Sequence, residues 1–139
     1  MKNLNEFQVV TSVVITDRRG NVLLGKRSMQ EDVFPGLWSI PGGKCESGQE
    51  CIEFLEKNAK REVKEEFGVD VHITDYLESH YNGEKKVYVT LIGRIANGIP
   101  RPLEDTYEVR WFSLEEALKL ELCPEVGRIL ELAIKHRKG

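Results

Sequence analysis

Cysteine is scarce in this 139-residue chain. Cys45, Cys51 and Cys123 are an odd number without a CxxC pair, which argues against a disulfide framework or a zinc site and favours free thiols in a reducing compartment. Apolar runs of the ~20 residues needed to cross a membrane are missing, and the N-terminal segment does not read as a signal peptide. We therefore expect a soluble cytoplasmic protein with no membrane partner.

An excess of positive charge is also missing. The formal net charge is −3, so the sequence carries no basic footprint for a DNA or RNA polymer. A protein of this charge that handles an anionic substrate needs local cations, either side chains or a bound metal. The length and the 40% hydrophobic content suit one core, which predicts a single domain over residues 1–139.

Strand-like and helix-like segments alternate along the chain. Runs rich in Val, Ile and Thr predict strands at about 8–17, 22–25, 71–81, 86–95 and 109–112, with the first two joined as a hairpin. Residues 29–48 are rich in turn-forming Gly and Pro. Helices are predicted over about 49–67, after a capping box at 113–116, and over 124–136. This order indicates an α/β class with a mixed sheet covered by helices.

The end of the predicted 49–67 helix concentrates acidic residues. Glu62 and Glu66 lie four positions apart, on the same side of a helix, where like charges repel. Glu65 and Glu66 also occupy the last turn, which already carries the negative end of the helix dipole. A divalent cation bound by these carboxylates would remove the conflict. The alternative is a solvated acidic helix end, partly offset by neighbouring lysines.

Two segments of the sequence resemble the conserved motif of a known family. Residues 61–69 read REVKEEFGV and residues 41–48 read PGGKCESG. In this order they resemble the two halves of the Nudix box, G-x5-E-x7-R-E-U-x-E-E-x-G-U, where U is aliphatic. Segments 24–27 and 108–116 extend the similarity over nearly the whole chain. The resemblance to the Nudix hydrolases implies an α/β/α sandwich with a mixed β-sheet, and a hydrolase that acts on phosphoric anhydride bonds.

The spacing departs from the box in one respect. Counted from Gly43, the box arginine should fall at position 57, but it falls at Arg61. Four extra residues therefore separate the loop from the acidic helix end, which leaves the roles of Glu50 and Glu53 open. We predict that the extra residues add a turn to a continuous helix that begins near position 49 or 50. Glu53 would then point away from the metal.

The resemblance implies a metal-dependent reaction. Carried over to this chain, Glu62 and Glu66 are the main ligands of Mg²⁺ or Mn²⁺, with help from Glu65 and from the carbonyl group of Gly43. Arg61 is expected to orient a carboxylate through a charge-assisted hydrogen bond. The metal would neutralise the diphosphate group and activate the attacking water.

A carboxylate is expected to act as the general base of this reaction. Glu62 is one candidate. Glu104 or Asp105, on the loop before the last predicted strand, is the other. The alternative for these two residues is an ordinary solvated loop.

Substrate contacts are expected from four residues. Lys26 and Arg27, at the end of a predicted strand, are candidates for binding phosphate groups, and the alternative is a surface basic pair. Phe34 and Trp38 are candidates for stacking on a base, and the alternative is burial in the core.

The substrate is expected to be a small-molecule nucleotide. Residues 34–43 (FPGLWSIPGG) resemble family members that hydrolyse nucleoside triphosphates to monophosphate and pyrophosphate. Nucleotide sugars, ADP-ribose and dinucleoside polyphosphates stay open, although the lack of a proline between Pro41 and Pro100 disfavours ADP-ribose.

Two alternatives belong to other functional classes. One is isopentenyl diphosphate isomerase, for which Cys45 lies near the loop but matching histidines are missing. The other is a non-catalytic nucleotide-binding module, which would be expected to have lost box carboxylates. The sequence does not define the oligomeric state, and a homodimer is compatible with it.

Overall fold

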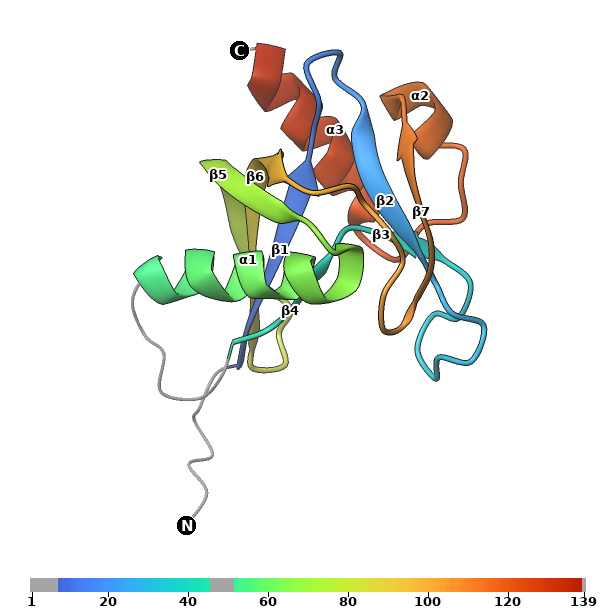
Figure 1. Cartoon of the computed structure of the whole chain (residues 1–139). Helices are drawn as coiled ribbons and strands as arrows, with labels where there is room; N and C mark the ends of the chain where they lie inside the picture. The colour runs from blue at the N-terminus through green and yellow to red at the C-terminus, as the bar shows by residue number, and fades with distance from the viewer. Residues whose placement is uncertain (1–7, 46–51, 139) are drawn as a thin grey trace.

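A computed structural model describes residues 8–45 and 52–138. Within this part of the chain, seven strands and three helices follow one another (Figure 1): β1 (Gln8–Ile15), β2 (Val22–Arg27), β3 (Trp38–Ser39), β4 (Gly42–Lys44), α1 (Ile52–Phe67), β5 (Asp70–Tyr81), β6 (Lys86–Asn97), β7 (Thr106–Phe112), α2 (Leu114–Ala117) and α3 (Val126–Lys138). None of these described helices combines the length and the apolar character needed to span a membrane.

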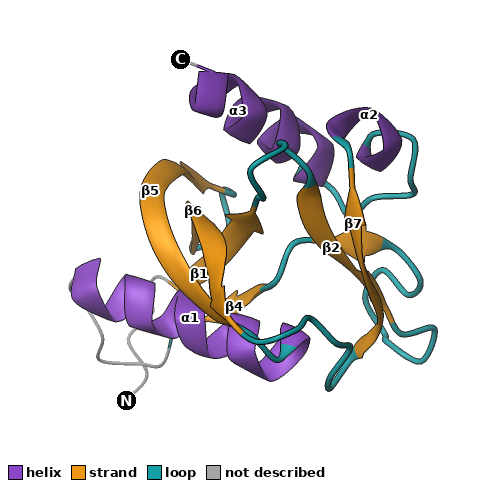
Figure 2. Ribbon diagram, turned by 45° about the horizontal axis from the view of Figure 1, so that its top comes forward, coloured by secondary structure: helices purple, strands orange, loops and turns teal. Residues whose placement is uncertain are grey.

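The strands form two sheets. The four-stranded sheet has the order β4-β1-β6-β5, and the three-stranded sheet has the order β3-β2-β7. β1 pairs with β6 in parallel and with β4 in antiparallel orientation, so the larger sheet is mixed. Helix α1 lies on one side of this sheet, whereas α3 lies on the other (Figure 2). This arrangement agrees with the predicted α/β class.

Alternation along β1 divides the apolar core into two layers. Val13 and Ile15 are fully buried and pack in the layer that contains α1. Val14, between them, is equally buried but packs in the layer that contains α3. Because successive side chains of a strand point to opposite faces, this one strand contributes to both layers. Its opposite faces also carry different parts of the candidate site.

The predicted hairpin between residues 8–17 and 22–25 is wrong. In the described part of the chain, β1 and β2 share an isolated bridge between Thr16 and Val22 and no ladder, and each strand lies in a different sheet. The turn itself forms: the Asp17 carboxylate accepts hydrogen bonds from the backbone N–H groups of Arg19 and Asn21, both at 2.9 Å. Pairing partners distant in the sequence therefore decide where the two strands go.

Several element bounds differ from the predicted ones. The turn-rich segment 29–48 contains two short strands, β3 and β4, and β7 begins three residues earlier than expected. The continuous helix is confirmed from Ile52 to Phe67, and the capping box of Ser113 and Glu116 is confirmed at α2. The proposed helix start near position 49, with Glu50, lies outside the described residues, as does the side chain of Glu53.

The C-terminal end of α1 is fastened to a loop. Gly68 ends the helix with φ of +71°, the left-handed conformation that glycine adopts without strain. The N–H groups of Arg101 and Leu103 donate to the carbonyl groups of Phe67 and Glu66, at 2.9 and 3.0 Å. These bonds satisfy carbonyl groups that a helix end leaves free, and they hold residues 101–105 beside the acidic turn of α1.

Gly25 tests the packing of β2 against α1. A Cβ at this position would lie 2.6 Å from Cε1 of Phe67, so Gly25→Ala is expected to lower the free energy of unfolding by about 1–3 kcal/mol through overpacking. Gly127 in α3 is the control, since its nearest contact would be 3.6 Å and Gly127→Ala should stabilise a helix by up to about 1 kcal/mol. Urea denaturation measures both changes. Equal effects of the two substitutions would contradict this packing.

Candidate active site

A cleft of about 810 Å³ is lined by strands of both sheets, by the end of α1 and by the start of α3. Its acidic and basic side chains come mainly from β2, α1 and the loop before β7, and Glu31 and Glu125 are added by the segments after β2 and before α3. Its aromatic and hydroxyl side chains come mainly from β1, β5 and β6. The lining includes Ser12, Lys26, Arg27, Phe34, Gly42, Glu62, Glu66, His80, Tyr88, Thr90, Glu104, Asp105 and Glu125.

Three carboxylates, Glu62, Glu66 and Glu104, form an acidic patch in this cleft. Burial is the main cause that raises the pKa of Glu66, to about 8, and the charges of Glu62 and Glu104 add to it. A hydrogen bond of 3.1 Å from the N–H of Gly42 and the charge of Arg27 oppose the shift. The patch therefore holds more negative charge than its own surroundings stabilise.

The pKa of Glu62 is also raised, but Glu62 has a cationic neighbour. Burial raises the pKa of its carboxyl group above the ordinary value, and the guanidinium of Arg61, 3.2 Å away, acts against the rise. The charges of Glu65 and Glu104 also raise the pKa. Arg61 is therefore placed to orient a box carboxylate.

The two glycines at 42 and 43 let β4 approach the neighbouring elements closely. A Cβ on Gly43 would lie 2.3 Å from Cδ of Glu62, and a Cβ on Gly42 would lie 2.3 Å from the carbonyl oxygen of Thr11. Any side chain at either position would displace these neighbours. The prediction that Gly43 lies near the carboxylate cluster is therefore confirmed.

The carbonyl group of Gly43, however, is not directed at the acidic patch. It accepts a hydrogen bond from Nδ2 of Asn58 at 3.2 Å, and Gly43 faces Thr11 in the β1–β4 pairing. The neighbouring Gly42 lines the cleft and donates its N–H to Glu66. Because the backbone groups of successive strand residues point to opposite edges, we infer that the Gly42 oxygen, on the same edge as its N–H, is the backbone oxygen nearer to the patch. This corrects the assignment of a metal-binding carbonyl to Gly43.

Glu65 lies apart from the other two carboxylates of its helix turn. Both of its carboxylate oxygens accept hydrogen bonds from Nη1 of Arg61, at 3.0 and 3.1 Å, and it does not line the cleft. As placed, Glu65 supports Arg61 instead of facing the patch with Glu62 and Glu66. The structure thus separates the three carboxylates among the predicted metal ligands into two groups.

The acidic patch fits a divalent cation by its chemistry. Hard cations bind carboxylate and carbonyl oxygens, and the raised pKa of Glu66 shows that a positive charge would stabilise its ionised form. As the side chains stand, no three His, Cys, Asp or Glu residues within 8–45 and 52–138 form a ready metal cage. Glu62, Glu66 and the carbonyl of Gly42 are the groups that would hold the cation.

The loop before β7 brings Glu104 and Asp105 into the cleft. Glu104 adopts φ of +51°, a left-handed conformation that costs a residue with a side chain of order 1 kcal/mol. Its charge acts on both Glu62 and Glu66. Both residues are also exposed, so the alternative of a solvated loop fits this placement as well, and the role of a general base stays a prediction.

Of the four predicted substrate contacts, three line the cleft and one does not. Lys26, Arg27 and the exposed Phe34 line the cleft, and Arg27 is held by Glu31 at 3.0 Å. Trp38 does not line it: this side chain is 8% exposed and packs edge-on against an aromatic ring of β7. Trp38 is therefore a core residue, and its assignment to base stacking is corrected.

A family profile described as NUDIX domain matches residues 6–133 of the chain. The chain belongs to the NUDIX domain family. Hydrolysis of phosphoric anhydride bonds, the enzyme class predicted from the box, is confirmed by this membership and by the named relatives. Nudix hydrolases generally need a divalent metal ion.

Relatives of known structure or named activity cover most of the chain. A CTP pyrophosphohydrolase of Escherichia coli (strain K12) is 30% identical over 130 residues, which are 90% of this chain and 89% of the relative. A crystal structure of a NUDIX hydrolase from Nitrosomonas europaea has a TM-score of 0.80 at 21% identity, covering 96% of this chain and 73% of that chain. An ADP-ribose pyrophosphatase from Streptococcus suis 89-1591 has a TM-score of 0.75 at 26% identity, covering 95% and 92%. The Nudix α/β fold is thereby confirmed.

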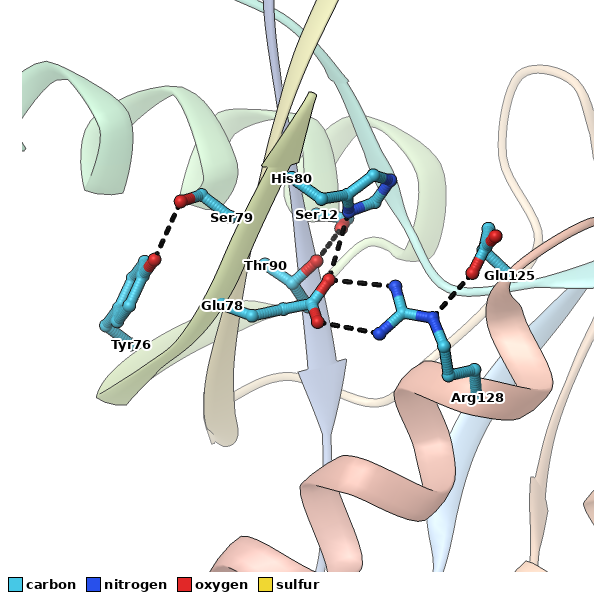
Figure 3. Close-up of polar contacts among 8 residues, drawn as sticks. All are labelled: Ser12, Tyr76, Glu78, Ser79, His80, Thr90, Glu125 and Arg128. Atoms are coloured by element: carbon cyan, nitrogen blue, oxygen red, sulfur yellow. Dashed lines mark hydrogen bonds and ion pairs between the residues drawn. The ribbon is translucent and has the colours of Figure 1, made fainter. Parts of the chain in front are cut away.

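The wall of the Nudix cleft formed by β1, β5 and β6 was not anticipated from the sequence. The ring of His80 stacks on that of Tyr88, with centroids 5.0 Å apart. The hydroxyl groups of Ser12 and Thr90 lie 3.3 Å apart on neighbouring strands (Figure 3). In the sequence, the signal for His80 and Tyr88 is the alternation of the two strands on either side of the Asn82-Gly83 turn. That alternation does not say which face of the strands lines the cleft.

An ion-pair cluster adjoins this wall. The guanidinium of Arg128 on α3 donates two hydrogen bonds to the carboxylate of Glu78, at 2.7 and 2.9 Å. The same carboxylate contacts Nδ1 of His80 at 3.0 Å, and Arg128 also donates to Glu125 at 2.6 Å (Figure 3). Hydrogen bonds from Arg128 are the main cause that lowers the pKa of Glu78 to about 2. The cluster thus ties β5 to the start of α3.

The Glu78–Arg128 pair predicts a dependence of stability on pH. Glu78 has a pKa of about 2 in the folded protein and about 4.3 when unfolded. Its stabilising contribution is therefore complete above the unfolded value and is lost as the pH falls from about 4.3 towards 2. Arg128→Gln should lower the free energy of unfolding by about 1–2 kcal/mol at pH 7, and this difference should shrink below pH 4.

Urea denaturation between pH 7 and pH 3 measures this difference. Lys119→Gln is the matched control, because Lys119 forms only a loose, exposed pair with Glu115 at 3.7 Å and such pairs contribute little. A difference for Arg128→Gln that does not change with pH would refute the assigned role of Glu78.

Proposed function

We propose that this cleft hydrolyses a nucleoside triphosphate to a nucleoside monophosphate and pyrophosphate, with Mg²⁺, or Mn²⁺ in its place, at the acidic patch. The observation that carries the proposal is the patch itself. Glu62, Glu66 and Glu104 share one cleft with Arg27 and Lys26, and the pKa of Glu66 is raised to about 8. The relative named CTP pyrophosphohydrolase supports a nucleoside triphosphate as substrate.

The cation and the basic residues have distinct tasks in this proposal. A divalent cation at Glu62, Glu66 and the Gly42 carbonyl would supply neutralisation of the diphosphate charge and activation of water. Arg27 and Lys26, which line the cleft from β2, bind and orient the phosphate groups. Orientation of this kind holds the diphosphate linkage in place for an in-line attack.

Glu104 is the proposed general base. Its carboxylate lies close enough to influence the charge of both Glu62 and Glu66, and its loop is held on the end of α1 by backbone hydrogen bonds. A carboxylate oxygen of Glu104 takes the proton of the attacking water, and Asp105, its neighbour in the cleft, is the second candidate. Arg61 keeps Glu62 and Glu65 in place by charge-assisted hydrogen bonds.

The stacked His80 and Tyr88 and the exposed Phe34 are the proposed contacts of the nucleoside. All three line the same cleft as the acidic patch. Aromatic faces bind bases by stacking, and the hydroxyl groups of Ser12 and Thr90 offer donors and acceptors to polar edges. ADP-ribose is the second candidate substrate, favoured by the similarity to the ADP-ribose pyrophosphatase.

A hydrolysis screen tests the function directly. The purified chain should be incubated with ribo- and deoxyribonucleoside triphosphates, ADP-ribose, nucleotide sugars and dinucleoside polyphosphates, with Mg²⁺ or Mn²⁺ and with excess EDTA. We expect a triphosphate to be turned over fastest, to give monophosphate and pyrophosphate, and EDTA to abolish turnover. Release of orthophosphate instead, or full turnover in EDTA, would contradict the proposal.

Glu66→Gln tests the acidic patch. It should lower kcat by at least about two orders of magnitude, because it removes a metal-binding carboxylate. The protein should fold with equal or greater stability, because the fold already disfavours the charged form of Glu66. The control is Glu56→Gln on the exposed side of the same helix, which should change neither quantity. A wild-type rate for Glu66→Gln would place the metal elsewhere.

A further inference from the structure

The middle of α1 contains a buried asparagine. Asn58 is 4% exposed, although asparagine is a poor helix former and an amide is costly to bury without hydrogen bonds. Each polar atom of its side chain has a partner. Nδ2 donates to Oγ1 of Thr11 at 2.8 Å and to the carbonyl of Gly43 at 3.2 Å, and Oδ1 accepts from Nη2 of Arg61 at 2.7 Å.

These three hydrogen bonds join three separate elements. Thr11 belongs to β1, Gly43 to β4, and Arg61 lies one turn further along α1. Within the described residues, β4 is a three-residue edge strand that pairs with β1, and its other neighbour is α1. On the side of α1, the amide of Asn58 holds β4 at Gly43, beside the hydrogen bond from Gly42 to Glu66.

The two groups that Asn58 binds outside β1, Gly43 and Arg61, are both connected to the acidic patch. Gly43 is covalently bonded to Gly42, whose N–H donates to Glu66. Arg61 contacts the carboxylate of Glu62 at 3.2 Å. A shift of Asn58 would therefore move the backbone ligand on one side of the patch and release the orientation of Glu62 on the other.

We propose that Asn58 is a positioning residue for the metal site: its amide sets the place of the Gly42–Gly43 strand and of Arg61, and thereby the affinity of the acidic patch for a divalent cation. This inference rests on the proposed metal-dependent function. Partners one step removed from a metal typically change its affinity 10- to 100-fold when they are lost.

The test separates positioning from packing by using Thr11. Asn58→Ala removes all three hydrogen bonds but leaves the buried hydroxyl of Thr11 without its donor, so it should also lower the melting temperature. Thr11→Val removes one bond of the same network and leaves those to Gly43 and Arg61. The double variant Thr11→Val/Asn58→Ala replaces both polar partners by apolar groups, which is often close to neutral for stability.

The readout is the dissociation constant of Mn²⁺ alone, measured by calorimetry, with thermal melting of the metal-free protein beside it. Asn58→Ala and the double variant should bind Mn²⁺ about tenfold more weakly than the wild type, whereas Thr11→Val should stay within about twofold. Near-wild-type melting of the double variant, together with weakened Mn²⁺ binding, is the expected signature. In turnover, the KM for metal should rise, and saturating metal should restore most of kcat.

Two results would overturn the proposal for Asn58 alone. One is a double variant that folds and binds Mn²⁺ as tightly as the wild type. The other is Thr11→Val weakening Mn²⁺ binding as much as Asn58→Ala, which would indicate a general packing effect. A wild-type protein that does not bind Mn²⁺ would overturn the proposed function as well, so the two failures are distinguishable.

Discussion

The close approach of β4 to α1 is the constraint on which the candidate site depends. No side chain fits at Gly42 or Gly43 without displacing Thr11 or Glu62, so the backbone of β4 lies directly against two elements. This contact buries the carboxylate of Glu66 beside a backbone N–H. Burial, more than any single charge, then raises the pKa of that carboxyl group. Backbone packing thus disfavours the ionised form of Glu66 unless a positive charge lies beside it.

The same contact explains why the patch needs partners of opposite charge. Within the described residues, Arg61 and Arg27 are the cations whose charges act on its carboxylates, and both are also bound to other acidic groups: Arg61 to Glu65, and Arg27 to Glu31. Their compensation is therefore partial. A cleft that combines uncompensated carboxylates with basic and aromatic walls suits a substrate that arrives as a metal complex of a phosphate chain.

Local patterns predicted much of the fold and the acidic half of the site. The apolar stripe and the Nudix box located α1, its end at Gly68 and the carboxylates, because these features depend on neighbours three or four residues away. Three features could not be predicted in this way: the placement of β1 and β2 in different sheets, the hydrogen bond between Asn58 and the Gly43 carbonyl, and the burial of Trp38. Each depends on partners distant in the sequence, as does the wall that contains His80. Asn58 is marked in the sequence by one feature: it is a poor helix former in the middle of a strong helix.

The alternation of β1 has a consequence for how this chain tolerates change. Thr11 faces α1 and holds the Asn58 amide, whereas Ser12, the next residue, lines the cleft. A slip of one residue in this strand would exchange the two faces: in one direction Val13 would replace Ser12 in the cleft, and Ser12 would lie against the helix. Single-residue insertions or deletions in β1 would therefore damage the scaffold and the binding surface together. Substitutions that keep the strand length can alter one face while sparing the other.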